Sequence, residues 1–212
     1  MLIAVVDDLE RQLKAGRLDT EAATTLVLAQ AQQRPELEGV RVTNRHGLVV
    51  AGKQVPGQPP LNLGDRDWFM WQRDNPGGGL YMSQPLRSRF DQAWILSFSR
   101  RYQDAQGQFA GTVTAAVPLS YFQQALQSLD VGAKGYVELR DGLLNRIAAS
   151  TQLPRADNEA PGSQPVAAEL RAALQSGAIR GTVQTPDSYT VSFERLGSVP
   201  LHVMVGLHND DT

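Results

Sequence analysis

The sequence has 212 residues with a formal net charge of −2, and its 42% apolar and 20% charged content is typical of an ordered globular protein with one large domain or two small ones. The slightly acidic balance, without any basic block, argues against a nucleic-acid-binding protein. The lack of cysteine excludes disulfides, thiolate metal sites and a cysteine nucleophile, and no run of about 18 apolar residues is available to span a bilayer.

The N-terminal part predicts a long helix followed by a hairpin. Apolar residues recur at helical spacing through residues 2–34, with Gly16 as a point where the helix can break and Pro35 as its end. Residues 39–51 alternate between apolar and polar side chains around a central turn, which is typical of a β-hairpin.

A short helix is predicted after the stretch Asp65-Arg66-Asp67-Trp68-Phe69. Asp65 is expected to cap it, Asp67 complements the helix dipole in its first turn, and Pro76 with the following glycines ends it. Arg66 beside Trp68 places a fixed cation near a flat apolar surface, as in many small-molecule pockets. The alternative is that the aromatic side chains here are simply core residues.

The rest of the chain predicts mostly strands, arranged twice in the order hairpin, helix, three strands, which indicates an internal structural repeat. In the strand 93–102, Ser97 and Ser99 are expected on the face opposite Leu96. Residues 150–165 contain three prolines and predict a mobile loop. Further strands are predicted at residues 80–85, 109–119, 136–139, 143–148, 179–184, 189–196 and 201–207, and helices at 120–129 and 166–175.

The ordered set of these segments resembles the double Cache sensor domains of bacterial receptors, most closely the periplasmic sensors of diguanylate cyclases and histidine kinases. The resemblance covers nearly the whole chain. It implies an α+β fold in which two tandem PAS-like antiparallel modules lie on a long N-terminal helix. The expected division is residues 1–34 for the helix, 35–129 for the membrane-distal, ligand-binding module and 130–212 for a smaller membrane-proximal module. The segments that carry the resemblance are Asp65 to Phe69, Arg73 to Pro76, Ser83 to Pro85, Trp94 to Arg101, Asp104 to Gly111, Tyr121-Phe122, Leu129 to Gly135 and Arg140 to Gly142.

The family also implies a ligand site. In its amino-acid-binding members, an Arg-x-Trp-Tyr segment holds the ligand carboxylate. Arg66, Trp68 and Phe69 match that segment, with Phe69 in place of the tyrosine, and Tyr81 resembles a tyrosine on the following strand. The resemblance therefore assigns carboxylate binding to Arg66.

The same comparison removes the part of the site that would hold an amine. The acids that bind the ligand ammonium in the family correspond to Ser83 and Ala116 here, and a buried ammonium without a counter-charge is costly. Ser97, Ser99 and Thr114 would add neutral hydrogen bonds from the sheet. The expected ligand is therefore a small mono- or dicarboxylate, ranked above amino acids and amines.

Taken together, the resemblance implies the periplasmic sensor region of an inner-membrane receptor, homodimeric in the full-length protein, with its flanking transmembrane helices outside this sequence. This region is expected to be non-catalytic and to relay to a cytoplasmic output domain, such as a diguanylate cyclase or histidine kinase. A ligand-free structural dimerisation module and an amino-acid or amine chemoreceptor sensor remain as alternatives, and a metal-dependent hydrolase has least support. No cofactor, metal site or nucleic-acid partner is predicted, because Asp65 and Asp67 suit a solvated helix start and the histidines are scattered.

Overall fold

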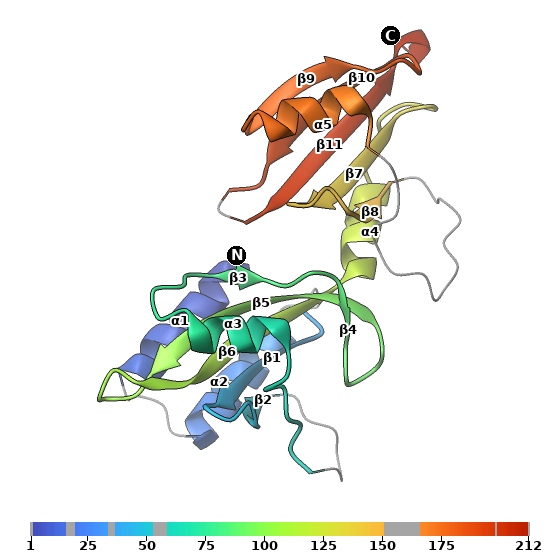
Figure 1. Cartoon of the computed structure of the whole chain (residues 1–212). Coiled ribbons are helices and arrows are strands. Elements are labelled where there is room, and N and C mark those ends of the chain that lie inside the picture. Colours follow the sequence, from blue (N-terminus) through green and yellow to red (C-terminus); the bar gives the residue numbers. More distant parts are fainter. Residues whose placement is uncertain are drawn as a thin grey trace. The chain divides into compact units, whose positions relative to one another are not determined.

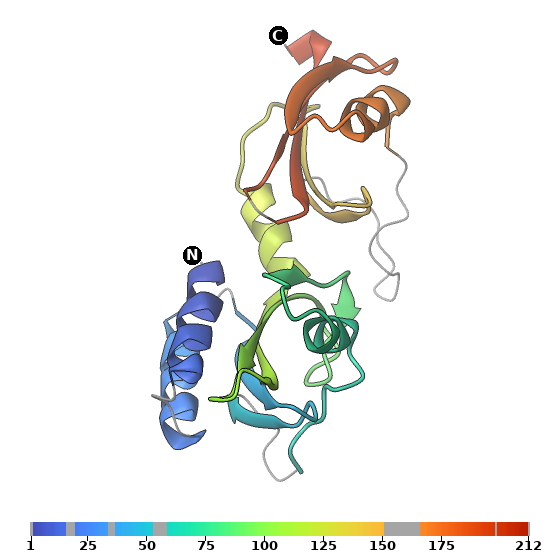
Figure 2. The same cartoon turned by 60° about the vertical axis from the view of Figure 1, so that its left-hand side comes forward.

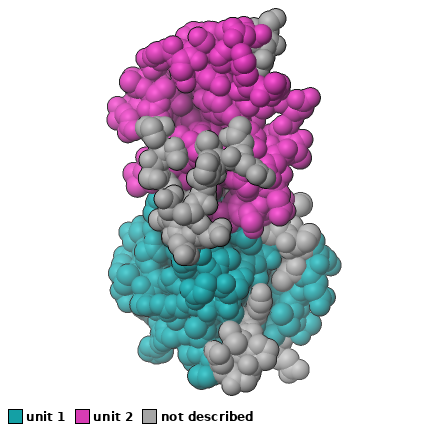
Figure 3. Space-filling model, turned by 90° about the vertical axis from the view of Figure 1, so that its right-hand side faces the viewer, with its two compact units in different colours: residues 1–118 teal, residues 119–212 magenta. Residues whose placement is uncertain are grey.

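The computed structural model describes residues 2–15, 20–33, 37–52, 59–150, 166–197 and 199–211 (Figure 1). The chain forms two compact units, Met1–Pro118 (unit 1) and Leu119–Thr212 (unit 2), which Figure 3 shows in different colours. Each unit contains one antiparallel sheet, so the predicted α+β fold with two tandem PAS-like sheets is confirmed.

The sheet of unit 1 contains the predicted hairpin and the two long predicted strands. Its strands are paired in the order β2-β1-β6-β5-β3, with β4 also on β5. Strand β1 pairs with β6, which is distant in the sequence, and this pairing brings Arg41 opposite Thr114. Strand β6 therefore lies between β1 and β5. The strands are β1 Gly39–Asn44, β2 Val49–Gly52, β3 Tyr81–Met82, β4 Leu86–Arg87, β5 Trp94–Gln103 and β6 Phe109–Pro118.

The helix predicted over residues 2–34 is divided in the structure into α1 (Leu2–Lys14) and α2 (Thr20–Gln32). Helix α1 lies on β5 and β6 and α2 on β1 and β2, so the two helices cover one face of the sheet side by side (Figure 2). A single helix of this length would extend about 50 Å, whereas the ten-residue strands beneath span about 33 Å. Division therefore lets both apolar stripes reach the sheet. Gly16, the expected break, lies outside the described residues.

The two faces of this sheet differ in polarity. The face toward α1 and α2 carries buried apolar side chains, because alternate residues of each strand point to the same side. They are Val40, Val42, Leu96, Phe98, Val113, Ala115 and Val117. Helix α3 (Asp67–Asp74) lies on the opposite face (Figure 2). The side chains of that face are also buried, yet they are mostly polar. This face carries Arg41, Thr43, Ser97, Ser99, Thr112 and Thr114.

Helix α3 begins one residue later than a cap at Asp65 would require. Arg66 holds the N-cap position and no side chain caps the helix, while Asp67 lies in the first turn as expected. The Asp65 carboxylate instead accepts hydrogen bonds from Arg89 at 2.9 and 2.5 Å, and this pairing draws it away from the helix N-terminus. The helix ends at Asp74, before Pro76, as predicted.

Unit 2 repeats the strand order of unit 1, as β8-β7-β11-β10-β9. Helix α4 (Leu119–Gln127) packs on β8, where Ala149 N donates to Gln123 Oε1 at 3.2 Å, so the boundary between units falls at Pro118 rather than at residue 129. Helix α5 (Ala168–Gln175) places Leu170 on the sheet core. The strands are β7 Tyr136–Asp141, β8 Arg146–Ala149, β9 Arg180–Gln184, β10 Tyr189–Arg195 and β11 Leu201–His208, followed by a 3-10 turn, Asn209–Asp211.

Two further expectations concern the loop at residues 150–165 and the lack of a membrane-spanning segment. The predicted loop over residues 150–165 lies outside the described residues apart from Ser150. Within the described ranges, none of the helices is both long and apolar enough to cross a bilayer.

Candidate ligand site beneath helix α3

A small cavity lies between α3, the β4–β5 segment and the polar face of the unit 1 sheet. Its volume is about 30 Å³, which is space for about one or two water molecules. Five predicted site residues line it: Arg66, Trp68, Ser97, Thr114 and Ala116. The structure therefore brings the predicted cation, one aromatic side chain and the neutral sheet positions together.

Two predicted aromatic residues do not line this cavity. Phe69 is 2% exposed and packs in the core, with its ring edge-to-face against Phe109 at 5.6 Å between centroids. Tyr81 stacks on Trp71 at 4.9 Å, and its hydroxyl donates to Asp67 Oδ2 at 3.5 Å. Partial burial raises the pKa of Tyr81, with a further contribution from Asp67, so its hydroxyl stays a donor.

Two predicted serines, Ser83 and Ser99, also do not line the cavity. Both form hydrogen bonds within unit 1 instead. Ser83 Oγ accepts a hydrogen bond from Ser97 N at 2.9 Å, which fixes the chain beside β5. Ser99 accepts from Gln72 Nε2, through its carbonyl oxygen at 2.7 Å and through its hydroxyl at 3.4 Å. Ser97 differs, since it lines the cavity and its hydroxyl makes no hydrogen bond to another described residue.

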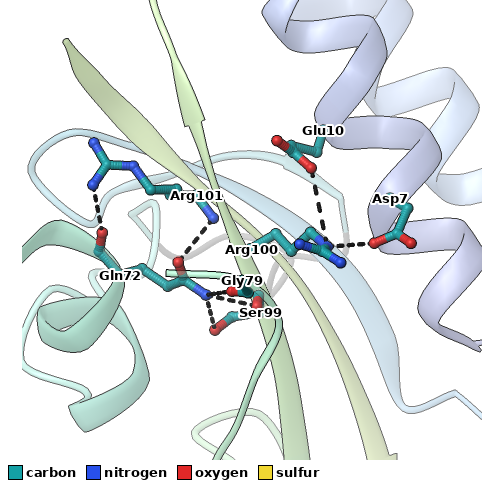
Figure 4. A network of polar contacts seen from close by, with 7 residues as sticks. All are labelled: Asp7, Glu10, Gln72, Gly79, Ser99, Arg100 and Arg101. Carbon is teal, nitrogen blue, oxygen red and sulfur yellow. Dashed lines mark hydrogen bonds and ion pairs between the residues drawn. The ribbon is translucent and has the colours of Figure 1, made fainter. Parts of the chain in front are cut away.

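Gln72, which no sequence pattern indicated, connects α3 to β5 through side-chain hydrogen bonds (Figure 4). It is fully buried; its Nε2 also donates to Gly79 O at 3.1 Å, and its Oε1 accepts from Arg101 N at 3.1 Å. Arg101 Nη1 donates back to Gln72 O at 3.2 Å. These hydrogen bonds use the side-chain amide of Gln72 at this end of the polar sheet face, although the buried Nε of Arg101 keeps no hydrogen-bond partner among the described residues.

On the other face of the same strand, Arg100 forms an ion pair with Asp7 of α1 and lies 4.0 Å from Glu10 (Figure 4). Consecutive residues of β5 thus connect to different helices, Arg100 to α1 and Arg101 to α3. This follows from the two-residue period of a strand.

Three arginines line the cavity, and two of them have carboxylate partners. Arg41 donates to both oxygens of Glu38 at 2.9 and 2.8 Å, and these side chains are only 5% and 2% exposed. Arg89 forms the ion pair with Asp65. Arg41 and Arg89 are therefore neutralised locally, although both are close to the cavity.

Arg66 is the third arginine and lacks such a partner. Its Nη2 donates to the carbonyl oxygen of Arg87 at 2.9 Å, and it forms no ion pair with any residue that the structure describes. Burial lowers the pKa of the Arg66 guanidinium, with a further contribution from the positive charge of Arg89. The lining as a whole therefore has an excess of about one positive charge at Arg66.

Sequence reasoning missed Arg41 and Phe90, which meet at the cavity. The Phe90 ring lies 3.7 Å from the guanidinium carbon of Arg41, a cation–π contact. Arg41 alternates with Val40 and Val42, a signal that it shares a sheet face with other polar residues. No comparable signal marks Phe90, because it lies in the segment between β4 and β5.

The described residues give no sign of a metal centre. No group of three or more His, Cys, Asp or Glu side chains among them is placed to hold a metal ion. The cavity lining contains arginine, serine and threonine but no acidic side chain, so its chemistry favours holding an anion.

Comparison by sequence gave no matching family model and no matching characterised protein. Comparison by structure found the extracellular domain of a proposed histidine kinase, rpHK1S-Z16, at 22% identity, 98% coverage of this chain, 86% of that chain and a TM-score of 0.81. A second such domain, mmHK1S-Z2, gave 16% identity, 99% and 90% coverage and a TM-score of 0.75. The ligand-binding domain of the Pseudomonas fluorescens chemoreceptor CtaA gave 15% identity, 98% coverage of this chain, 83% of that chain and a TM-score of 0.65.

This chain has the fold of those extracellular sensor domains. The shared sensor-domain fold includes both units, because the alignments cover 98% or more of the chain. At these identities the likeness establishes the fold alone, and the sensor fold leaves the choice of ligand to the side chains of each unit.

Proposed function

We propose that this chain is the extracytoplasmic sensor region of a bacterial transmembrane signalling receptor and that unit 1 binds a small carboxylate beneath α3. The observation that carries the proposal is Arg66, a partly buried guanidinium at a polar cavity that has no carboxylate partner among the described residues. A planar guanidinium can hold both oxygens of a carboxylate.

The neighbouring side chains suit an anion without an amine. Ser97 offers an unused hydroxyl, Thr114 lines the sheet side, and Trp68 covers the site with an apolar surface. The chemoreceptor CtaA has been solved with L-isoleucine and with L-serine. In this chain the lining residues include no acid, and Ala116 presents only a methyl group, so a ligand ammonium would have no counter-charge there.

Binding requires the cavity to widen, because about 30 Å³ does not accommodate a carboxylic acid. Phe90 lines the cavity and contacts Arg41, so its displacement from Arg41 would enlarge the cavity. The Arg89–Asp65 pair that holds the same segment is largely exposed, with side chains 34% and 66% accessible, and such pairs contribute about 1 kcal/mol or less.

In the full-length receptor, the expected partner is a second copy of the chain, and the output is a cytoplasmic catalytic domain such as a diguanylate cyclase or histidine kinase. The sensor region itself carries no reaction in this proposal. A carboxylate would act by binding one arrangement of α3 and β5 more tightly than another. Gln72 and Arg100 connect β5 to α3 and α1, respectively, and offer a physical route for that difference.

The test starts with a thermal-shift screen of the chain against mono- and dicarboxylates, amino acids, amines and purines, since a ligand that binds the folded state raises its apparent stability. A hit is then measured by calorimetry. Arg66→Ala should lose on the order of 2 kcal/mol or more of binding free energy, and Arg66→Lys should recover only part of it.

Arg73→Ala is the matched control, because Arg73 is exposed on the same helix and pairs with Asp74. It should bind as wild type does. The proposal fails if the confirmed ligand binds Arg66→Ala as tightly as wild type, or if it is a cationic amine. A tight dimer together with no hit in the screen would favour the structural dimerisation module instead.

A further inference from the structure

Unit 2 contains a cavity between its sheet and the helix α5, in the position equivalent to the cavity beneath α3 and much larger than it. Its volume is about 300 Å³, about twice the ~150 Å³ of an engineered cavity that binds benzene. The cavity is large enough for a small organic molecule.

One end of this cavity is built from three charged side chains on β7 and β8. Arg140 Nε donates to Glu138 Oε2 at 2.7 Å, and both residues are buried, 3% and 7% exposed. Arg146 Nε lies 2.8 Å from the other oxygen of the same carboxylate. Two guanidinium groups thus share one carboxylate, which leaves about one positive charge in excess at this end of the cavity, while Asp187 contributes a negative charge elsewhere in the lining.

Arg146 is the less firmly held of the two arginines, although it too forms an ion pair with Glu138. Although Glu138 Oε1 is close, it lies off the N–H direction, and the buried Nε of Arg146 has no acceptor in hydrogen-bond geometry. No hydrogen bond from its guanidinium to another described residue is formed, whereas Arg140 also donates to Leu144 O at 2.8 Å. A structural ion pair needs only one of these arginines, so the second is available for an external anion.

The walls beyond the charged end are flat and apolar. The rings of Tyr136 and Tyr189 lie 5.3 Å apart, and Leu170 of α5 and Val191 of β10 complete the enclosure. Gly206 permits this arrangement, because a Cβ at that position would lie 2.3 Å from Cε1 of Tyr136.

The Tyr136 hydroxyl adds a donor within the cavity. Burial raises the pKa of Tyr136 to about 12, with smaller contributions from nearby carboxylates, so the hydroxyl stays protonated at neutral pH. It makes no hydrogen bond to another described residue, whereas the Tyr189 hydroxyl already donates to Lys134 O at 3.1 Å.

We infer that unit 2 holds a second binding site, which takes a small monocarboxylate with a flat apolar body, such as an aromatic acid. The carboxylate would pair with Arg146, and the apolar body would lie against the two tyrosine rings on the side that faces Leu170. Asp187 also lines the cavity but is exposed, so water screens its repulsion of an anion. This inference does not depend on carboxylate binding in unit 1.

The experiment is calorimetric titration of the whole chain with benzoate, 3-phenylpropionate and indole-3-carboxylate. At least one should bind saturably, and the uncharged amide of that ligand should bind about tenfold more weakly or worse. Arg146→Gln should also weaken binding about tenfold or more while the fold is retained, because Glu138 keeps Arg140 as its partner.

Two further variants locate the site. Arg180→Gln removes an exposed arginine of unit 2 that does not line the cavity, and Arg66→Gln disables the unit 1 site; both should bind the aromatic acid as wild type does. A second variant of the unit 2 site, Tyr136→Phe, removes only the hydroxyl and should weaken binding by a smaller factor.

The inference is overturned if none of the three acids binds below about 10 mM, which corresponds to less than about 3 kcal/mol of binding free energy at the scale of 1.4 kcal/mol per tenfold. It is equally overturned if Arg146→Gln binds as wild type does. Binding that falls with Arg66→Gln but not with Arg146→Gln would place the aromatic acid in unit 1, which would support the proposed function and reject the second site.

Discussion

The two units share one strand order but differ in the space beside their arginines. In unit 1, Arg41 and Arg89 each have a carboxylate partner, Arg66 has none among the described residues, and the cavity is about 30 Å³. In unit 2, Arg140 and Arg146 share one carboxylate beside about 300 Å³ of open space. The fold thus fixes the place of a cavity, while the size of the nearby side chains sets which ligand it can hold.

Removing Glu38, the carboxylate partner of Arg41 in unit 1, should have the largest effect on stability. Glu38→Gln leaves the buried Arg41 without its counter-charge, so the free energy of unfolding of unit 1 should fall by about 3 kcal/mol. The same change removes one negative charge beside the cavity and should tighten the binding of an anion to unit 1. Urea denaturation followed by tryptophan fluorescence reports on unit 1, because Trp68, Trp71 and Trp94 all lie there.

Asp74→Asn is the control, because Asp74 pairs with Arg73 on the surface and should change stability by about 0.5 kcal/mol or less. Equal free energies of unfolding for Glu38→Gln and Asp74→Asn would show that the buried Glu38–Arg41 pair stabilises unit 1 no more than a surface ion pair does.

The hydrogen bonds of Gln72 should be next in magnitude. Gln72→Met keeps most of the side-chain volume but leaves Arg101 N without its acceptor and Gly79 O without a donor, so unit 1 should lose about 2 kcal/mol. Chemical denaturation measures the loss, with the exposed Gln32→Met as control. A loss as small as that of the control would mean that α3 is held to β5 by packing alone.

The ion pair between β5 and α1 should contribute less. Arg100 and Asp7 are 26% and 37% exposed, so the coupling energy from a double-mutant cycle of Arg100→Gln and Asp7→Asn should be about 1 kcal/mol or less. The coupling should decrease further at high salt, because exposed pairs are screened. A coupling that is independent of salt would argue that the pair is not solvated.

The smallest effect concerns the acid sensitivity of unit 2. His202 pairs in register with Arg140, its Nδ1 has no hydrogen-bond partner among the described residues, and burial lowers its pKa below the usual 6.5. The unfolded chain then binds a proton at a higher pH than the folded chain, so stability should fall as pH drops below about 6.5. His202→Gln should flatten this slope, and His46→Gln, which changes an exposed histidine, should not.

The periodic parts of the chain were predictable, and the convergence at the site was only partly so. Alternation in residues 93–102 gave β5 and placed Ser97 opposite Leu96, because a strand imposes a period of two. The sequence around Arg66 indicated residues that line the cavity. It could not distinguish Trp68, which lines the cavity, from Phe69, which packs in the core. Arg41 was missed because only the pairing of β1 with β6 brings it there.

Strand β5 also constrains how the sequence can change during evolution. Arg100 and Arg101 are neighbours in the chain, yet one reaches α1 and the other α3 (Figure 4). A one-residue insertion or deletion between Trp94 and Arg100 would exchange the faces of every following side chain in the strand and break both attachments at once. Related sequences are therefore expected to keep the length of β5 and to vary instead in the exposed turn at residues 105–108.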